Sequence, residues 1–164
     1  MTSFVAILMG SESDLPVMQS ACEVLGKFGV RFEVRITSAH RTPEDTRDYV
    51  EDAEARGCKV FIAGAGMAAH LAGAVAARTL KPVIGVPIDS GPLQGVDALL
   101  STAQMPGGIP VATVAIGKAG AKNAAYLAAQ IMAVTDDSLH QKLADERADN
   151  AEAIRESNRK IEFE

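Results

Sequence analysis

Short apolar runs recur along the chain and alternate with longer stretches of mixed polarity. The runs are Phe4–Met9, Phe32–Ile36, Val60–Ala63, Val83–Val86 and Val111–Ile116. They are rich in Val and Ile, and apolar residues hold most of their positions, which is typical of strands covered on both faces. We therefore predict buried strands of a parallel sheet at these places.

The segments between the runs carry signals for helices. Ser13 or Asp14 can cap a first helix, which Gly29 would end. Thr42 can cap a second helix that opens at Pro43, since Pro is tolerated in a first turn. Helices are therefore expected over 15–28, 43–56, 68–79, 96–104 and 119–134.

This repeated alternation of strand and helix predicts the α/β class, with an open, doubly wound parallel sheet. We expect one catalytic domain over residues 1–135 and a charged helical tail over 136–164. The tail has few apolar anchors, so two interpretations stay open. It is either a solvated terminal helix that frays or an arm that docks on a neighbouring subunit.

Composition narrows the classes of partner. The 164 residues carry 16 Lys+Arg against 21 Asp+Glu, a formal net charge of −5, and no basic block. This balance argues against nucleic acid or an anionic membrane as the main partner. No stretch approaches the roughly 20 apolar residues of a bilayer span. Cys22 and Cys58 form no CxxC pair, which favours a reduced, cytoplasmic protein.

Polar residues that could bind a ligand lie in the loops that follow the predicted strands, which is where open parallel sheets bind their ligands. After the first run, Ser11 and Ser13 offer hydroxyls at a helix start, where a phosphate can bind. Arg41, after the second run, can add a charge-assisted contact, and Asp14 suits sugar hydroxyls because it would repel a phosphate. The alternative is that Ser13 and Asp14 only cap the helix. The motif GxxxxGK[ST] of triphosphate hydrolysis is absent.

Two histidines lie on the same predicted rim of the sheet. His40 stands in the second loop beside Arg41, and His70 lies at the start of the third helix. An ordinary imidazole titrates near pH 6.5 and can both donate and accept a proton at neutral pH. A loop histidine can also be a plain surface residue, and His140 in the tail is interpreted so. We favour an acid/base role on the rim.

The glycines after the third run do not indicate a dinucleotide cofactor. Gly64-x-Gly66-x-x-Ala69 resembles that fingerprint, but 80–87 lacks the acidic residue the motif needs about 20 positions on. We expect these glycines to let a ligand approach the backbone. The chain has no HxxxH spacing and no cysteine cluster, so neither a metal nor another cofactor is expected.

Several strings together resemble the class I PurE family of N5-carboxyaminoimidazole ribonucleotide mutases, enzymes of purine synthesis. They are Met9-Gly10-Ser11-x-Ser13-Asp14, Ser38-Ala39-His40-Arg41-Thr42-Pro43, Gly64-Ala65-Gly66-x-Ala68-Ala69-His70-Leu71 and Gln104-Met105-Pro106-Gly107-Gly108-Ile109-Pro110-Val111. The similarity runs from about residue 4 to residue 143, and the order of the strings makes it specific.

The resemblance implies a three-layer αβα sandwich with a flavodoxin-like sheet, assembled as a homo-octamer. It implies an isomerase that moves a carboxylate from the exocyclic nitrogen of a ribonucleotide to ring carbon C4, without metal, biotin or ATP. His40 would be the catalytic acid/base. The substrate-binding residues would be Ser11, Ser13 and Arg41 on phosphate, Asp14 on ribose, and Ser38, Ala39, Gly66 and His70 around the base and carboxylate.

Three departures from the family pattern concern the pocket wall. Met67 stands where the family commonly has Gly, Ala72 where Pro usually follows His-Leu, and the fourth loop, 89–93, reads DSGPL. Two other functions stay open at this point. One is direct carboxylation of aminoimidazole ribotide with CO2, as in class II relatives, and the other is a non-catalytic phosphosugar sensor.

Overall fold

The computed structural model describes residues 3–161; residues 1–2 and 162–164, the outermost parts of the two predicted ranges, lie outside the described residues. The strands are β1 Phe4–Met9, β2 Phe32–Ile36, β3 Cys58–Gly66, β4 Val83–Ile88 and β5 Ala112–Thr113. The helices are the 3₁₀ turn η1 Glu12–Asp14 and α1 Leu15–Phe28, α2 Pro43–Ala55, α3 Leu71–Ala76, α4 Val96–Ala103, α5 Lys118–Ala133 and α6 Asp137–Arg159.

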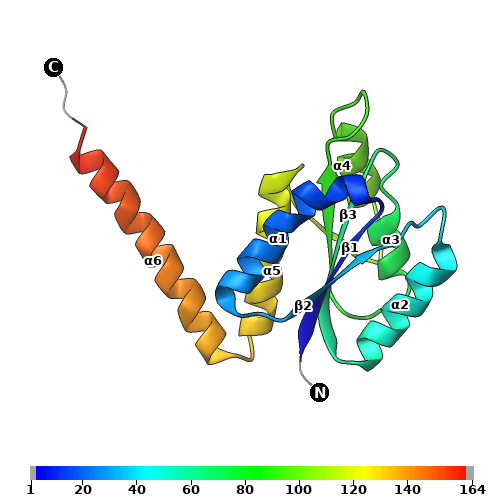
Figure 1. Ribbon diagram of the computed structural model, residues 1–164, viewed down its shortest axis with the longest axis horizontal. Helices are drawn as coiled ribbons and strands as arrows, with labels where there is room; N and C mark the ends of the chain where they lie inside the picture. The colour runs from blue at the N-terminus through cyan, green and yellow to red at the C-terminus, as the bar shows by residue number, and fades with distance from the viewer. Residues whose placement is uncertain (1–2, 162–164) are drawn as a thin grey trace.

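The strands form one five-stranded parallel sheet in the order β2-β1-β3-β4-β5. Helices cover both faces of the sheet, so the fold is the predicted three-layer α/β sandwich (Figure 1). Because the chain passes from β2 back across β1 to β3, the strand order reverses beside β1. Ligands of doubly wound sheets bind at such a reversal.

Two apolar cores lie on the two faces of this sheet. Ile7 of β1 and Ile62 of β3 are buried in the core that α1 and α5 close. Leu8 and Phe61, their neighbours in sequence, point to the opposite face and pack with α2 and α3. This division follows from the two-residue period of a strand. Every residue of β1 is buried, as predicted for a strand covered on both faces.

The prediction that all strands are covered on both faces is wrong for the two edge strands, for β5, where Ala112 is exposed and Thr113 half-buried, and for β2. This strand lies at the edge of the sheet, and Val34 and Ile36 keep 43% and 50% of their surface exposed. Its sequence alternates apolar residues with Glu33 and Arg35, which is the pattern of a strand with one covered face, but the apolar positions Val34 and Ile36 are themselves left partly exposed in this chain.

Several predicted bounds also differ from the structure. β3 and β4 continue to Gly66 and Ile88, into residues predicted as loop, because both pair with each other along their length. β5 is only Ala112–Thr113 and α3 only Leu71–Ala76, both shorter than predicted. Thr42 precedes α2 as expected, but its side chain makes no cap hydrogen bond.

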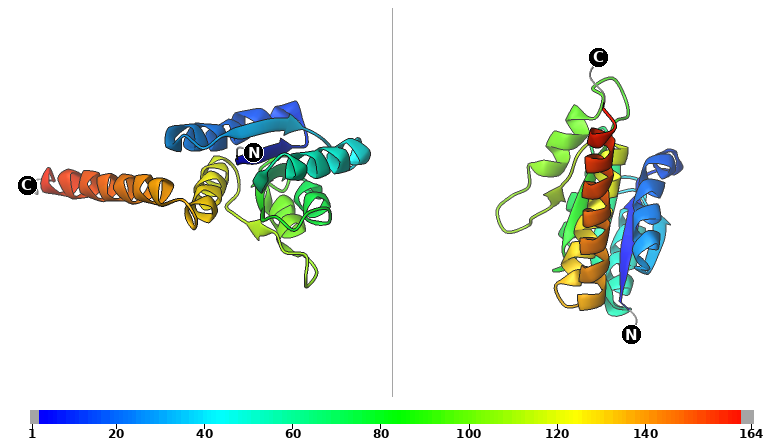
Figure 2. Two further views of the ribbon diagram at one scale, coloured as in Figure 1. Left: turned by 90° about the horizontal axis from the view of Figure 1, so that it is seen from below. Right: turned by 90° about the vertical axis from the view of Figure 1, so that its left-hand side faces the viewer.

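α6 continues the chain beyond α5 and projects from the sandwich as a long helix (Figure 2). Its first half is attached to the body of the protein. Lys142 Nζ donates to the Phe28 carbonyl oxygen at 3.1 Å, and Glu146 pairs with Lys27 and accepts from the Tyr126 hydroxyl at 2.8 Å. These polar contacts hold the first half of α6 against the protein, and the helix continues beyond them to Arg159.

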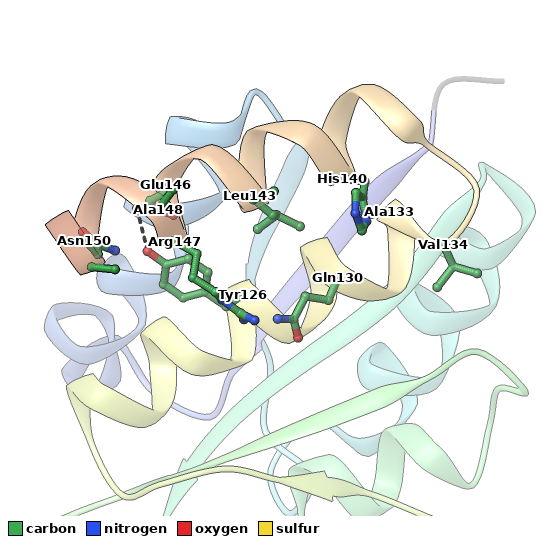
Figure 3. Close-up of a pocket in the computed structure, with 12 residues that line it drawn as sticks. Tyr126, Gln130, Ala133, Val134, His140, Leu143, Glu146, Arg147, Ala148 and Asn150 are labelled. Atoms are coloured by element: carbon green, nitrogen blue, oxygen red, sulfur yellow. Dashed lines mark hydrogen bonds between the residues drawn. The ribbon is translucent and has the colours of Figure 1, made fainter.

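A groove of about 700 Å³ runs between α5 and α6. Tyr126 and Gln130 of α5 lie opposite Leu143 of α6 across it (Figure 3). His140 lies at the same groove and is exposed, in agreement with the prediction. Within residues 3–161, no helix combines the length and apolar character needed to cross a membrane.

Two glycine-to-alanine substitutions test this packing with opposite expected signs. A Cβ on Gly120 in α5 would overlap the carbonyl oxygen of Ala115, a backbone atom that cannot rotate away. Overpacking of this kind costs roughly 1–3 kcal/mol. A Cβ on Gly26 in α1 would meet nothing within 4 Å. Helix propensity then favours Ala by about 0.5–1 kcal/mol.

We therefore expect Gly120→Ala to lower the Tm and Gly26→Ala to raise it slightly, measured at one fixed protomer concentration. An unchanged Tm for Gly120→Ala would contradict the contact between the start of α5 and the residues before it.

Candidate functional site

A cavity of about 300 Å³ opens at the carboxyl ends of β1, β2 and β3, beside the reversal of strand order. It brings together all the site residues expected from the sequence. They are Ser11, Ser13, Asp14, Ser38, Ala39, His40, Arg41, Gly66 and His70. The cavity is smaller than the groove between α5 and α6, but it is the one at the carboxyl ends of the strands, and it has two imidazoles beside its serine hydroxyls, guanidinium and carboxylate, where the groove has His140 alone.

The loop after β1 folds as a single 3₁₀ turn whose cap is Ser11. Its Oγ accepts from the Ser13 amide at 3.4 Å and from the Ser13 hydroxyl at 3.1 Å. Asp14 Oδ2 accepts from the Ser11 amide at 3.1 Å, which completes a reciprocal capping box. Ser11 therefore caps the 3₁₀ turn η1, and the N-cap position of α1 itself is Asp14, one of the two predicted caps, although its side chain makes no cap hydrogen bond to α1. The polar groups at the cavity thus also stabilise the turn.

Asp14, the last residue of this 3₁₀ turn, is buried. Burial in a weakly polar environment raises the pKa of its carboxyl above the ordinary value, and hydrogen bonds from the Ser11 and Gly10 amides partly oppose that shift. A carboxylate held in this way is directed toward neutral donors, such as sugar hydroxyls, and is poorly suited to contact a phosphate.

Arg41 reaches from the second loop to the first. Its Nη2 donates to the Gly10 carbonyl oxygen at 3.3 Å, and its amide donates to Ser38 Oγ at 3.1 Å. The guanidinium therefore lies beside the turn that carries Ser11 and Ser13. Hydroxyls and a guanidinium on adjacent loops form a suitable site for an oxyanion such as a phosphate.

The second loop is held from below by a chain of hydroxyl groups. Thr42 Oγ1 accepts from the Ser38 amide at 3.0 Å, which explains why it is not free to cap α2. The hydroxyls of Thr37 and Thr46 are buried and 2.6 Å apart. These contacts fix both ends of the short segment that carries His40.

His40 and His70 meet over the cavity. His40 Nε2 lies 2.7 Å from His70 Nδ1, and the rings are nearly perpendicular, with centroids 4.8 Å apart. A hydrogen bond of this kind needs one N–H and one lone pair, so one ring must present an unprotonated nitrogen. His70 is at the start of α3, as predicted. The sequence placed both histidines on one rim but did not predict their direct contact.

Close packing explains the glycines after the third run. A Cβ on Gly64 would overlap Met18, and one on Gly66 would overlap Ser90 Oγ. The expectation that both glycines admit a ligand is therefore wrong for Gly64, whose free side is filled by α1. Gly66 lines the cavity and allows Ser90 to reach it.

Six residues that line the cavity are not among the expected site residues, although Met67 and the loop of Ser90 were expected to concern the pocket wall. The six are Gly10, Ala65, Met67, Ala68, Leu71 and Ser90. All but one belong to strings that carry the family resemblance, and Ser90 follows the fourth predicted strand, so extending the prediction to whole loops would have found them. Within residues 3–161, no group of three or more His, Cys, Asp or Glu side chains has the arrangement of a metal site.

Comparison with known proteins identifies the family of this chain. The family model described as AIR carboxylase matches residues 4–153. Proteins named N5-carboxyaminoimidazole ribonucleotide mutase are 52% identical over 158 residues in Bacillus subtilis, covering 96% of this chain and 98% of the relative, and 54% identical over 153 residues in Escherichia coli K12, covering 93% and 90%.

The crystal structure of Treponema denticola PurE superposes with a TM-score of 0.89 at 32% identity and covers 98% of this chain and 99% of that chain. The match thus extends through α6 and confirms the resemblance and the fold expected from the sequence. The chain belongs to the AIR carboxylase family.

Proposed function

We propose that this protein is an N5-carboxyaminoimidazole ribonucleotide mutase that produces 4-carboxy-5-aminoimidazole ribonucleotide. The observation that carries the proposal is the juxtaposition, in one cavity, of an imidazole pair with a hydroxyl and guanidinium cluster. The curated relatives at 52% and 54% identity carry the name of this enzyme, which favours the mutase over direct carboxylation.

The two ends of the cavity suit the two ends of a ribonucleotide. In the proposed complex, Ser11, Ser13 and Arg41 hold the phosphate. Asp14 accepts hydrogen bonds from the ribose. The imidazole base then lies toward His40 and His70, with Ser38, Ala39 and Gly66 around it.

His40 moves the one proton that the reaction requires. In the first half, it protonates the exocyclic nitrogen of the carbamate, and the N–C bond breaks to give CO2 and the neutral amine. In the second half, the electron-rich ring carbon C4 attacks CO2, and the neutral imidazole removes the C4 proton to restore aromaticity. The proton count balances, because the proton that His40 gives to nitrogen is replaced by the one it takes from carbon.

The contact with His70 leaves a defined nitrogen for this chemistry. His40 Nε2 faces His70 Nδ1, so Nδ1 of His40 is available for the substrate while that contact persists. Proton transfer by a placed side chain contributes roughly 10²–10⁴-fold. Orientation of the reactants and retention of CO2 must supply the rest of the acceleration.

We also propose that the chain works as a homo-oligomer, an octamer as the family resemblance implies. The outer half of α6 supports this, because it leaves the protein's own sandwich and Ile154 keeps 71% of its surface exposed. The groove between α5 and α6 adds apolar surface. We place the enzyme in the cytoplasm, since a charged ribonucleotide does not cross a bilayer unaided and must be used where it is made.

The function is tested by offering the purified protein each candidate substrate. We expect conversion of the N5-carboxy ribonucleotide into the C4-carboxy product, followed by absorbance or mass. His40→Asn keeps the size of the side chain but cannot carry the proton, so we expect it to abolish conversion while the affinity for ribotide stays within a few-fold.

Turnover of aminoimidazole ribotide plus bicarbonate, without turnover of the N5-carboxy compound, would overturn the mutase assignment in favour of direct carboxylation. Binding without any turnover in the unsubstituted protein would indicate a phosphosugar sensor. Normal turnover by His40→Asn would show that another group carries the proton.

Asp14 gives a prediction for stability against pH. The folded state raises the pKa of this carboxyl, so it binds the proton more tightly than the unfolded chain does. Its contribution to stability is present below the unfolded pKa of about 3.9 and is lost as pH rises through the folded pKa. At pH 7, Asp14→Asn should therefore be at least as stable as the parent protein, although it binds ribotide more weakly.

This advantage should shrink as the pH is lowered toward 4, measured by Tm. Glu51→Gln on the exposed face of α2 is the control for loss of a single charge. A Tm of Asp14→Asn below that of the parent at pH 7 would mean that the hydrogen bonds to the carboxylate outweigh its burial.

The oligomer is tested by light scattering of the full chain. We expect a single species of several times the 17.2 kDa chain mass, with eight copies as the specific expectation. A stable monomer at micromolar concentration would contradict any assembly, and a smaller closed oligomer would contradict the octamer.

A further inference from the structure

The loops that follow β3 and β4 contact each other through Met67 and Gly91. Met67 follows β3 and Gly91 follows β4, and the two residues lie in contact. A Cβ built on Gly91 would lie 3.3, 3.5 and 3.6 Å from Cγ, Sδ and Cε of Met67. The Met67 side chain therefore packs over Gly91, at distances that range from slightly tight to ordinary van der Waals contact for a Cβ at that position.

The backbone at Met67 is in an uncommon conformation. Its φ is +54°, in the left-handed region that favours glycine. The segment is held by α4, because the Ala69 amide donates to Ser101 Oγ at 3.0 Å. Non-glycine residues in this region cluster at ligand sites, and such an outlier is a starting point for a functional hypothesis.

Met67 also lines the substrate cavity, together with Ser90 and His70. About half of its surface, 53%, is exposed, so the side chain lies at the mouth and not in the core. It thus bridges the loops after β3 and β4 at the base and carboxylate end of the cavity. His40, which contacts His70, lines the same cavity.

We propose that Met67 is a positioning residue that retains CO2 in the cavity between the two halves of the reaction. The inference rests on the proposed mutase function, in which CO2 is bonded to nothing after the N–C bond breaks and before the C4–C bond forms. CO2 is small, uncharged and linear, so only the cavity wall keeps it beside C4. A flexible, apolar thioether fills an irregular opening and excludes water, which would otherwise provide an exit.

The proposal is tested by the exchange of CO2 with solvent during turnover. Unlabelled N5-carboxy substrate is supplied with ¹³C-bicarbonate and carbonic anhydrase, and the label in the C4-carboxy product is measured after subtraction of enzyme-free exchange. We expect Met67→Gly to raise the ¹³C content of the C4-carboxy product by roughly three- to ten-fold, because a small decrease in the barrier to CO2 escape increases the escape rate by such factors. The release of aminoimidazole ribotide should rise by the same factor.

Two matched variants separate this role from relief of backbone strain. Gln94→Gly removes the other described non-glycine residue at positive φ, +52°, from the same pair of loops, and Gln94 does not line the cavity. It should leave exchange and turnover unchanged. Met67→Leu keeps an apolar side chain of similar size and should hold exchange near the parent level.

The outcomes distinguish this inference from the function on which it rests. If the parent protein does not interconvert the two carboxylates, the proposed function fails. If the parent is active but Met67→Gly exchanges no more label than the parent, the retention role is wrong. Equal leakage from Met67→Leu and Met67→Gly, or from Gln94→Gly, would likewise overturn it, because neither result depends on the size of residue 67.

Discussion

The placement of β1 between β2 and β3 is the constraint on which the rest of the structure depends. Parallel pairing on both sides of β1 sets the ends of the three strands at one edge of the sheet. The loops that follow them must then converge, whatever their own sequences favour. Every residue of β1 is buried, and alternate residues belong to the two cores. A slip of the strand by one position would therefore move each side chain into the other core and disrupt the packing of both. The position of the cavity is therefore determined by core packing and backbone pairing more than by its own polar groups.

Two features of the cavity wall are unfavourable for stability of the folded chain. Asp14 is buried where its ionised form is disfavoured, and Met67 adopts a backbone conformation that suits glycine better. Neither feature improves packing of the sandwich. Both are tolerated because neighbouring contacts hold them, the Ser11 amide on Asp14 and Ser101 on the segment after Met67. Local features of this kind concentrate at sites whose geometry serves a ligand.

The sequence predicted the fold through signals that are local. The five apolar runs, Pro43 after Thr42 and Gly29 at φ +72° place strands and helix ends close to where they lie. What it missed depends on contacts between distant segments. The exposure of β2 follows from its place at the edge, the shortness of β5 from its limited pairing with β4, and the His40–His70 contact from two loops 30 residues apart. The proposed roles of the site residues come from recognisable strings, and the structure adds that three of these strings, those around Ser11, His40 and Gly66, line one cavity.

The acid/base role proposed for His40 needs a precisely held ring, and contacts below the surface loop hold the segment that carries it. His40 is exposed and lies on a loop, which alone would leave its ring free to turn. The residues on either side of it are nevertheless fixed: the Thr37 and Thr46 hydroxyls are joined in the interior, and Thr42 Oγ1 holds the Ser38 amide. His70 then restrains the ring itself from another loop. In the proposed reaction the imidazole must be accessible to the substrate and must also be fixed in position. A surface loop with buried anchors provides the access and the rigidity together.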